Sequence, residues 1–526
     1  MSELLRLDNL TIGAETSIVK KLSLTLQNGE KLGIVGESGS GKTLSALSLA
    51  GLLPGNLRIL SGSITLNLPD GIVQFPGANK TQMLQLRRKA LGFVFQEPMS
   101  ALNPVKCCGY QLMENLQMSG LTDKNKQRLS AIKWMEEVQL PDPERIMDAY
   151  PHQLSGGQRQ RLMIAMAMCN HPLLLIADEP TTALDVKVRD VVLDLMELLC
   201  EKYNTALLLI SHDLKMVANR CENIAVLKNG TLCEYGTASE LVNNPKHPYT
   251  KALWACRPDP NHRLIPLPTV GEIVANKYMA REAISHEAWK NIGWKLQQKT
   301  PLLRGQALTF AYGDNQILNG MDFELYPGES LGILGESGCG KSTLSRIICG
   351  LEAVQGGILE YYDGLQYIDL AAQKRLWRAE RIQMIFQDST AALNPNHRIG
   401  RILGETRKHF FPQEKREKRN GALLAMIATM GLPEDSLMRY PHSFSGGQKQ
   451  RICIARALLA EPRILICDES VAALDVSVQA QILNLLHHIR ESMGVSFIFI
   501  SHDPNTVRYF CHRVVEMNKG NVERIT

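Results

Sequence analysis

The sequence lacks the features that would insert the chain into a bilayer or send it to secretion. No run of about 18 apolar residues occurs, so no segment is expected to span a membrane. Residues 162–177 come nearest, but Asn170, His171 and Pro172 interrupt the apolar run. The opening MSELLRLDNL has no basic region followed by an apolar core, so it does not resemble a signal peptide.

Cysteine spacing and net charge exclude further classes of protein. Twelve cysteines are scattered over 526 residues, and none forms the CxxC pairs of a zinc site. This usage indicates a reducing compartment. The 58 basic and 53 acidic residues give a formal net charge of +5. Over this length such a charge is weak evidence for a polyanion, and we expect no nucleic-acid partner.

One eight-residue pattern is present, and it occurs twice. Gly36–Thr43 reads GESGSGKT and Gly335–Ser342 reads GESGCGKS, and both fit the P-loop spacing. Each follows a short apolar run, at residues 31–35 and 330–334, that is typical of a buried strand. Each leads into a predicted helix whose N-terminus favours an anion. The pattern therefore predicts two sites for a nucleoside triphosphate.

The residue types within these loops suit phosphate and magnesium. Lys42 and Lys341 are placed to reach the β- and γ-phosphates, and Thr43 and Ser342 to put a hydroxyl on Mg²⁺. Cys339 lies inside the second loop, where an accessible and partly ionised thiol would make that site sensitive to maleimide. The other residues expected to contact phosphate are Gly36, Ser38, Gly39, Gly41, Gly335, Ser337, Gly338 and Gly340.

The repetition extends through the chain. The two P-loop lysines are 299 residues apart, and Gln96 and Gln387 are 291 residues apart. Three later pairs are each 290 residues apart: Ser155 and Ser445, Glu179 and Glu469, and His212 and His502. The first half is thus longer by eight residues, within the turn-rich stretch 61–80. Such a long period indicates two homologous domains and not a solenoid. We expect domains at residues 1–255 and 301–526, and a proline-rich linker at 256–300 with a helix over 281–298.

Further polar side chains follow predicted strands in each half. Gln96 and Gln387 precede proline-containing loops (FQEPMSALNP and FQDSTAALNP), where an amide can touch both Mg²⁺ and the attacking water. Two later strands end in Asp-Glu and in Ser-His-Asp in each half. The Asp suits the Mg²⁺ shell, the Glu can orient or deprotonate water, and the His can sense the γ-phosphate. These residues are Asp178, Glu179 and His212, repeated as Asp468, Glu469 and His502.

A second glycine-rich pattern is LSGGQ at residues 154–158, repeated as FSGGQ at 444–448. Both run into a predicted helix. Small residues at a helix N-terminus leave N–H groups and a positive dipole end for an anion. The pattern predicts a second phosphate contact per domain, closing over the γ-phosphate from the opposite side. Its members are Ser155, Gly156, Gly157, Ser445, Gly446 and Gly447.

Together with Ala-Leu-Asp at 183–185 and 473–475, these motifs resemble the nucleotide-binding domains of ABC proteins. The resemblance covers residues 1–255 and 300–526. It implies an α/β fold of two tandem P-loop NTPase domains, each with a RecA-like core, an antiparallel β subdomain and a helical subdomain. It also implies ATP and Mg²⁺ as cofactors, with the metal on Thr43, Gln96, Asp178, Ser342, Gln387 and Asp468.

In that family two domains pair head to tail, and each ATP lies between one P-loop and the other domain's LSGGQ. The resemblance therefore implies that the two halves of this chain form the ATPase dimer. Site one joins Lys42, Thr43, Gln96, Asp178, Glu179 and His212 to Ser445 and Gly447. Site two joins Lys341, Ser342, Gln387, Asp468, Glu469 and His502 to Ser155 and Gly157.

Two stretches indicate a particular group within the ABC family. FQEPMSALNP, and HPYTKAL at residues 247–253, resemble the ATPases of the bacterial peptide/nickel import group. This implies two integral-membrane permease subunits as partners, an extracytoplasmic solute-binding protein acting indirectly, and a place at the cytoplasmic face of the inner membrane. The cargo stays open between peptides, nickel, and metal-chelate or opine-type solutes. Only Cys256 follows HPYT, so the iron–sulfur cluster proposed for that group is not expected here.

Two other classes of ATPase also carry two such domains in one chain. A ribosome-associated translation-factor ATPase typically reads Asn-His-Leu-Asp after the glutamate, whereas this chain reads Thr-Thr-Ala-Leu-Asp at 181–185. A tandem sugar-importer ATPase usually has an altered second P-loop, which is intact here. Peptide/nickel import is therefore the leading interpretation.

The two halves differ where ABC domains usually stack the adenine ring. The second half reads LTFAY at residues 308–312, and Tyr312 is the candidate for this stacking. The first half reads LTIGA at 10–14, and no aromatic residue occurs before Phe75. We therefore expect site two to bind ATP more tightly. The alternative is that a ring from elsewhere, or an aliphatic side chain such as Ile12, covers the adenine in the first half.

Overall fold

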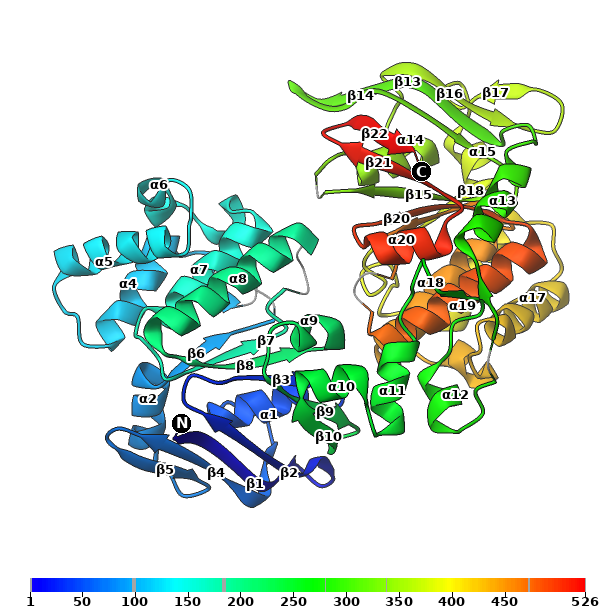
Figure 1. Ribbon diagram of the computed structural model, residues 1–526. Coiled ribbons are helices and arrows are strands. Elements are labelled where there is room, and N and C mark those ends of the chain that lie inside the picture. The colour runs from blue at the N-terminus through cyan, green and yellow to red at the C-terminus, as the bar shows by residue number, and fades with distance from the viewer. Residues whose placement is uncertain are drawn as a thin grey trace. The chain divides into compact units, whose positions relative to one another are not determined.

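The computed structural model describes residues 2–96, 101–181, 186–279, 281–336, 338–471 and 474–525. It divides into two compact units, Met1–Ala255 and Cys256–Thr526 (Figure 1). Ser337, Ala183 and Ala473, with the stretches 97–100 and 182–185 of the predicted loops, lie outside the described residues. In the described part, no helix combines the length and apolar character needed to cross a membrane.

The first unit contains two sheets. The four-stranded antiparallel sheet has the order β2-β1-β4-β5, and the six-stranded sheet has the order β10-β9-β3-β8-β7-β6. Strands β3, β6, β7, β8 and β9 run parallel, and β10 is antiparallel to β9. The strands are β1 (Glu3–Gly13), β2 (Ser17–Gln27), β3 (Lys31–Val35), β4 (Arg58–Leu68), β5 (Gly71–Phe75), β6 (Leu91–Val94), β7 (Leu174–Asp178), β8 (Ala206–Ser211), β9 (Asn223–Lys228) and β10 (Thr231–Thr237).

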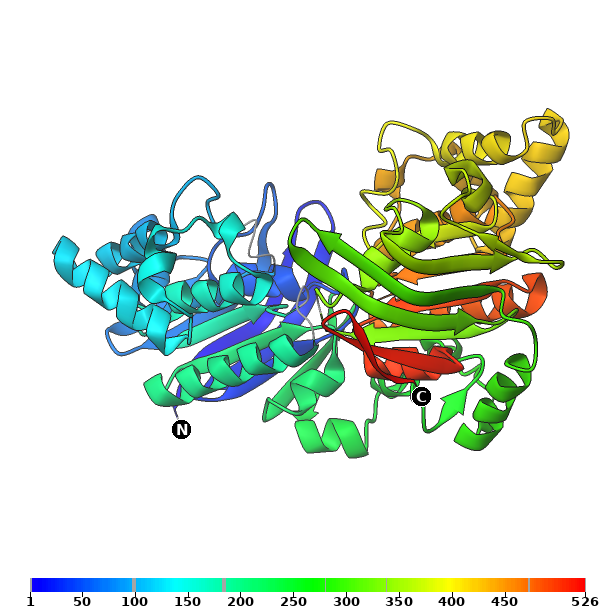
Figure 2. The same ribbon diagram turned by 90° about the horizontal axis from the view of Figure 1, so that it is seen from above.

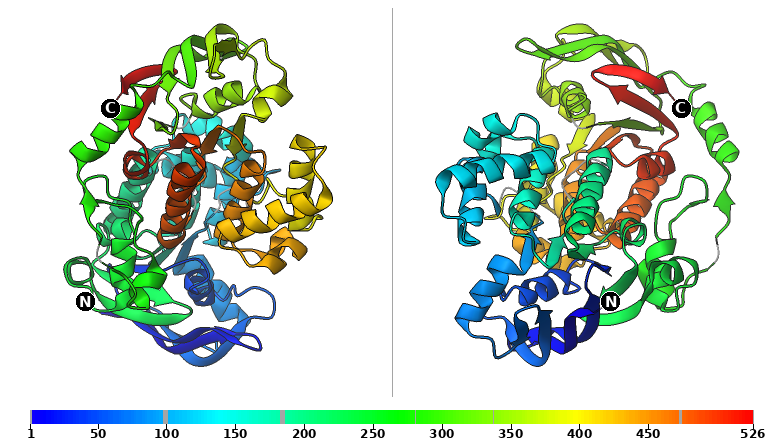
Figure 3. Two further views of the ribbon diagram at one scale, coloured as in Figure 1. Left: turned by 90° about the vertical axis from the view of Figure 1, so that its right-hand side faces the viewer. Right: turned by 60° about the vertical axis from the view of Figure 1, so that its left-hand side comes forward.

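Helices cover this core and form a separate group beside it. The cyan helices α4–α6 stand together at one end of the unit, away from the antiparallel sheet (Figures 2 and 3). They correspond to the stretch that the sequence predicts to be mostly helical. The helices are α1 (Lys42–Leu49), α2 (Lys80–Lys89), α4 (Cys108–Met118), α5 (Lys124–Glu137), α6 (Pro143–Asp148), η1 (Pro151–Gln153), α7 (Gly156–Met168), α8 (Val186–Tyr203), α9 (Leu214–Ala218), α10 (Ala238–Asn243) and α11 (Pro248–Ala255).

The second unit repeats this plan with sheets β14-β13-β16-β17 and β18-β19-β20-β15-β21-β22. Its strands are β11 (Arg263–Leu264), β12 (Ala283–Ile284), β13 (Leu303–Tyr312), β14 (Asn315–Leu325), β15 (Ser330–Gly335), β16 (Gly356–Tyr362), β17 (Tyr367–Asp369), β18 (Ile382–Ile385), β19 (Ile464–Asp468), β20 (Ser496–Ser501), β21 (Arg513–Asn518) and β22 (Asn521–Ile525). Its helices are α12 (Val270–Val274), α13 (His286–Leu296), α14 (Lys341–Cys349), α15 (Arg375–Ala379), α16 (Ile399–Phe410), α17 (Arg416–Thr429), η2 (Glu434–Met438), η3 (Pro441–Ser443), α18 (Gly446–Leu458), α19 (Val476–Met493) and α20 (Pro504–Phe510). The predicted tandem α/β fold is confirmed.

The apolar runs of the sequence become the central strands. All five residues of β7 and all six of β8 are buried, because other elements, including α1 and the antiparallel sheet, pack on the faces of the parallel sheet. The polar residues that follow β3, β7 and β8 consequently meet at one edge of the sheet. The length difference between the halves has a local cause. Strand β4 has 11 residues where β16 has 7, and α2 has 10 where α15 has 5.

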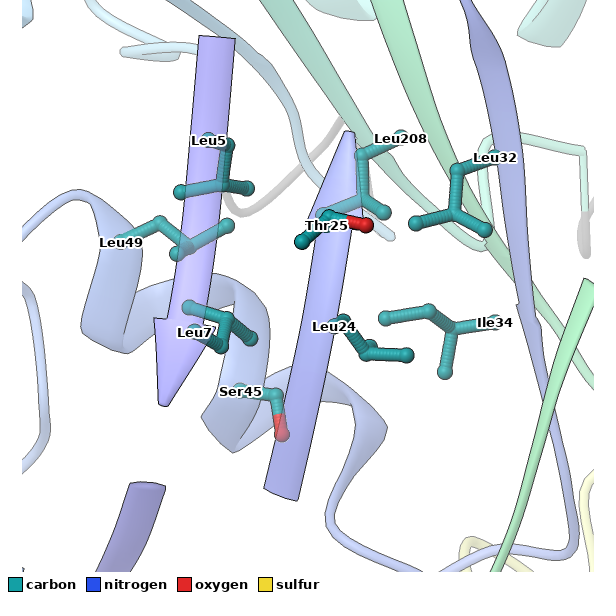
Figure 4. Close-up of a pocket in the computed structure, with 9 residues that line it drawn as sticks. All are labelled: Leu5, Leu7, Leu24, Thr25, Leu32, Ile34, Ser45, Leu49 and Leu208. Atoms are coloured by element: carbon teal, nitrogen blue, oxygen red, sulfur yellow. The ribbon is translucent and has the colours of Figure 1, made fainter. Parts of the chain in front are cut away.

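The antiparallel sheet closes over the P-loop helix through an apolar core. The packing leaves a cavity of about 10 Å³, which is too small for a nucleotide (Figure 4). The cavity lies where β1 and β2 pack against β3, β8 and α1. Its lining residues are Leu5, Leu7, Leu24, Thr25, Leu32, Ile34, Ser45, Leu49 and Leu208.

Residues 256–279 and 281–296 belong to the second unit and run along its edge (Figure 3). Arg263 is 1% exposed and donates to the carbonyls of Arg508 (2.6 Å) and Tyr509 (2.9 Å) at the end of α20. Burial lowers the pKa of the Arg263 guanidinium to about 10. Trp289 on α13 donates its indole N–H to the carbonyl of Cys511 (2.8 Å). The helix predicted over 281–298 begins only at His286, where the Ser285 hydroxyl caps it.

Candidate active site

Each P-loop curls around the ammonium group of its lysine. Lys42 Nζ donates to the carbonyls of Gly36 (2.8 Å) and Glu37 (2.9 Å). Lys341 Nζ makes the same bonds to Gly335 (2.8 Å) and Glu336 (2.7 Å). Gly41 and Gly340 cap the following helices with φ of 95° and 106°, a left-handed conformation that glycine adopts without strain. The two loops therefore have the same compact shape.

A buried aspartate faces the hydroxyl that follows each lysine. Thr43 Oγ1 donates to Asp178 Oδ1 (3.2 Å), and Ser342 bonds the side chain of Asp468. Burial raises the pKa of both aspartates, because a charged carboxylate is costly away from water. Within the described residues, Asp468 Oδ1 is buried without a hydrogen-bond partner. A buried, incompletely bonded carboxylate beside a hydroxyl fits a hard cation such as Mg²⁺.

In the first unit a glutamine and a histidine both contact the carboxylate of one glutamate. Gln96 Nε2 donates to Glu179 Oε2 (3.2 Å), and His212 Nδ1 lies 3.3 Å from the same oxygen. Gln96 follows β6, Glu179 follows β7 and His212 follows β8, so three strand ends supply the three groups. The glutamate is thus oriented from two sides.

The second unit repeats the arrangement. Gln387 Nε2 donates to Glu469 Oε2 (2.7 Å), and His502 Nδ1 lies 3.4 Å from Oε1. The hydrogen bond with His502 lowers the pKa of Glu469, because it stabilises the charged carboxylate. A carboxylate that stays ionised and carries two polar neighbours is suited to bind and orient a water molecule.

Both glutamates have an unusual backbone. Glu179 has φ 45° and Glu469 has φ 48°, in the left-handed region that side chains other than glycine rarely adopt. Their N–H groups donate to the carbonyls of Ile210 and Ile500 on the neighbouring strands, both at 2.9 Å. Strain of this kind costs about 1–3 kcal/mol and is concentrated at functional sites. Sequence alone did not reveal it.

The LSGGQ segments lie at helix starts, as predicted. Ser155 caps α7 and Ser445 caps α18, each in a reciprocal pair with the glutamine three residues on. A Cβ on Gly157 would lie 2.8 Å from Val188 Cγ1, and one on Gly447 2.3 Å from Val478 Cγ1. The glycine therefore permits close packing against the next helix. Gly156 and Gly446 are the first residues of their helices.

Tyr312 ends β13 and is 45% exposed. Its hydroxyl donates to Glu352 Oε1 (3.1 Å), and its ring meets the edge of Phe310 at 4.9 Å. Ile12, the first-half counterpart of Phe310, is fully buried and has no surface for an adenine ring.

Cys339 is not the reactive thiol that its place in the loop suggested. Its side chain is 7% exposed, and burial raises its pKa, an effect that Lys341 only partly opposes. The thiolate is the reactive form. The two conditions for maleimide sensitivity are therefore not met, and that prediction is wrong.

We now expect maleimide to modify Cys339 slowly in the native protein. Inactivation of ATP hydrolysis by maleimide should proceed at the same rate in wild type and Cys339→Ser, with or without ATP. Mass spectrometry of the labelled peptides would check this directly. Rapid labelling of Cys339 that ATP suppresses would contradict the assignment of a buried, protonated thiol.

Sequence reasoning missed one residue that touches a P-loop. Tyr249, in the HPYT stretch, is fully buried, and its Oη accepts a hydrogen bond from the N–H of Glu37 (3.1 Å). The two residues are 212 positions apart in the sequence. The signal was present as the HPYT motif, but no local pattern indicates what its tyrosine contacts.

Comparison with known proteins defines the class to which this fold and site belong. The family model described as "ABC transporter" matches residues 19–182 and 318–472. A second model, "Oligopeptide/dipeptide transporter, C-terminal region", matches residues 233–281, which include HPYT. The chain belongs to the ABC transporter family, as the motifs predicted.

Similar full-length proteins agree with this assignment. The chain is 37% identical over 548 residues to the glutathione import ATP-binding protein GsiA of Escherichia coli (strain K12), covering 99% of this chain and 86% of that protein. It is 36% identical to GsiA of Pectobacterium atrosepticum, covering 98% and 84%. The chain is thus an ATPase of the peptide-importer type, and the ribosome-associated alternative finds no support.

Two solved structures are each similar to less than half of the chain. A dimeric cassette in a post-hydrolysis state bound to ADP and Pi is 27% identical, with a TM-score of 0.40, covering 45% of this chain and 99% of that one. The cbiO1 protein of Clostridium perfringens, part of an ABC transporter complex, is 26% identical, with a TM-score of 0.40, covering 43% and 88%.

Proposed function

We propose that the two halves of this chain form the ATPase dimer of a bacterial peptide importer. The two halves pair head to tail, and each ATP lies between one half's P-loop and the other half's LSGGQ segment. ATP binding closes the halves and hydrolysis reopens them. This motion drives two integral-membrane permease subunits from the cytoplasmic face of the membrane.

The observation that carries the proposal is the convergence of glutamine and histidine on one glutamate in both units. In site one Glu179 takes the proton of the attacking water, Gln96 orients that water, and His212 stabilises the γ-phosphate. Lys42 holds the β- and γ-phosphates. Glu469, Gln387, His502 and Lys341 do the same in site two. Ser155 and Ser445, with the glycines beside them, complete the opposite site.

Magnesium would be held by Thr43, Asp178 and Gln96 in site one and by Ser342, Asp468 and Gln387 in site two. When bound, Mg²⁺ supplies positive charge that offsets the charge developing on the transferred phosphoryl group. Its charge would also offset the free-energy cost of burying the Asp178 and Asp468 carboxylates, a cost that their raised pKa reflects.

The cargo we propose is a short peptide of the size of glutathione, and an extracytoplasmic solute-binding protein delivers it. Full-length similarity to glutathione import ATP-binding proteins supports this, and so does the oligopeptide/dipeptide segment. Neither match favours nickel.

Purification from membranes in mild detergent tests the partners. The tagged chain should retain two permease polypeptides in stoichiometric amounts, and ribosomal proteins in their place would contradict the proposal.

Uptake of labelled glutathione should fail in cells lacking the chain and return with the wild-type gene. Wild-type uptake in the deletion strain would reject this cargo.

A further inference from the structure

The HPYT segment is built to hold one tyrosine in place. It lies in the first unit, where His247 precedes α11 and the next three residues form the first turn of that helix, which Figure 1 labels. Glu234 of β10 accepts hydrogen bonds from the backbone N–H groups of Lys246 (2.7 Å) and His247 (3.1 Å). His247 Nδ1 accepts the N–H of Tyr249 (3.1 Å), and Pro248 starts the helix. Three hydrogen bonds thus fix the backbone that leads into Tyr249, and the last of them is made by the Tyr249 N–H itself.

The tyrosine that these contacts fix reaches the P-loop. Its side chain is 0% exposed, and its Oη accepts the N–H of Glu37 (3.1 Å). Lys228, at the end of β9, places Nζ 4.7 Å from the centre of the ring. A cation over the ring face adds to the attraction that holds the ring in position.

Glu37 is the P-loop residue whose carbonyl positions the lysine. Its carbonyl accepts Lys42 Nζ (2.9 Å) and the N–H of Ser40 (3.1 Å). Glu37 therefore contacts two residues through its backbone: its N–H donates to Tyr249, and its carbonyl accepts from Lys42. A short chain of bonded groups connects the HPYT tyrosine to the ammonium group that binds phosphate.

We propose that Tyr249 is a positioning residue for ATP binding at site one. It keeps Glu37, and through it Lys42, in the geometry that receives the phosphates. This proposal rests on the proposed function of the P-loops. It gives the HPYT motif of this chain a physical role beyond marking a subfamily.

Removing only the hydroxyl isolates this role. Tyr249→Phe keeps the ring and its packing but leaves the Glu37 N–H without this acceptor. The loss of one such bond corresponds to a factor of about 2 to 10 in affinity. Lys42 binds the phosphates both before and during the reaction. Tyr249→Phe should therefore raise the Kd and KM for ATP and leave kcat unchanged.

The experiment measures ATP binding by each site separately in the full-length chain. Lys341→Ala leaves site one, and Lys42→Ala leaves site two. Adding Tyr249→Phe to Lys341→Ala should raise the Kd for a non-hydrolysable ATP analogue about 2- to 10-fold. Adding it to Lys42→Ala should change nothing. Tyr235→Phe, which removes an exposed hydroxyl from β10, is the matched control and should leave both Kd values unchanged.

A purely structural role would give a different pattern. It would lower the melting temperature of the nucleotide-free protein and the fraction of active molecules, with the Kd of the folded protein unchanged. That result, or equal weakening of both sites, would overturn the proposal. If neither single-lysine variant binds the analogue, the proposed nucleotide function itself fails, which separates the two hypotheses.

Discussion

Replacing both Glu179 and Glu469 by glutamine is expected to slow ATP hydrolysis roughly 10²–10⁴-fold, the range for loss of a general base. Glutamine keeps the size of the side chain but cannot take a proton from water. Each single substitution should slow only its own site. ATP binding should survive, because the P-loop lysines are unchanged, and the double variant should stay in the closed, ATP-bound state.

Steady-state release of phosphate, measured beside equilibrium ATP binding, checks this prediction. Glu287→Gln is a suitable control, because Glu287 is exposed on α13 and lies outside both proposed sites. It should retain wild-type turnover. Unchanged turnover in the double variant would remove both glutamates from the chemical step, whatever their contacts with Gln96 and Gln387.

Site two is expected to bind ATP about 5- to 150-fold more tightly than site one, the factor that corresponds to one base–aromatic stacking interaction. Tyr312 is half-exposed, and its contacts with Glu352 and Phe310 favour one position of its ring. At the matching positions the first unit has Ala14 and the fully buried Ile12. Neither can offer a ring to adenine.

Titration of Lys42→Ala and Lys341→Ala with ATP measures this difference. Lys42→Ala, which keeps site two, should bind more tightly, and adding Tyr312→Ala should abolish the advantage. Tyr312→Phe is the control: it keeps the ring, loses the bond to Glu352, and should retain most of the affinity. Equal binding by the two lysine variants would show that stacking on Tyr312 does not operate.

Much of the fold and the candidate site could be predicted because the informative residues are consecutive. Asp178 ends a buried strand and Glu179 follows it directly, and His212 follows the neighbouring strand, so the parallel sheet brings them to one edge. The P-loop carries its own turn, helix start and lysine within eight residues. Local chemistry decided these features, and the structure has the strands where the apolar runs predicted them.

Other features depend on contacts between distant residues, which one sequence does not specify. The bond from Glu37 to Tyr249 joins positions 212 apart, and Arg263 caps a helix 245 residues away. The left-handed backbone of Glu179 accompanies a hydrogen bond from its N–H to Ile210 on the neighbouring strand. Cys339 seemed reactive from its motif, but whether a thiol is buried is decided by tertiary packing.

The central claim is that each ATP site combines residues of both halves, and the serines of the LSGGQ segments test it most directly. In Glu469→Gln only site one hydrolyses ATP. Phosphate release by this variant in a single turnover should be abolished by adding Ser445→Arg and spared by adding Ser155→Arg. Abolition by Ser155→Arg with Ser445→Arg harmless would mean that each half works with its own LSGGQ segment, which would contradict the account.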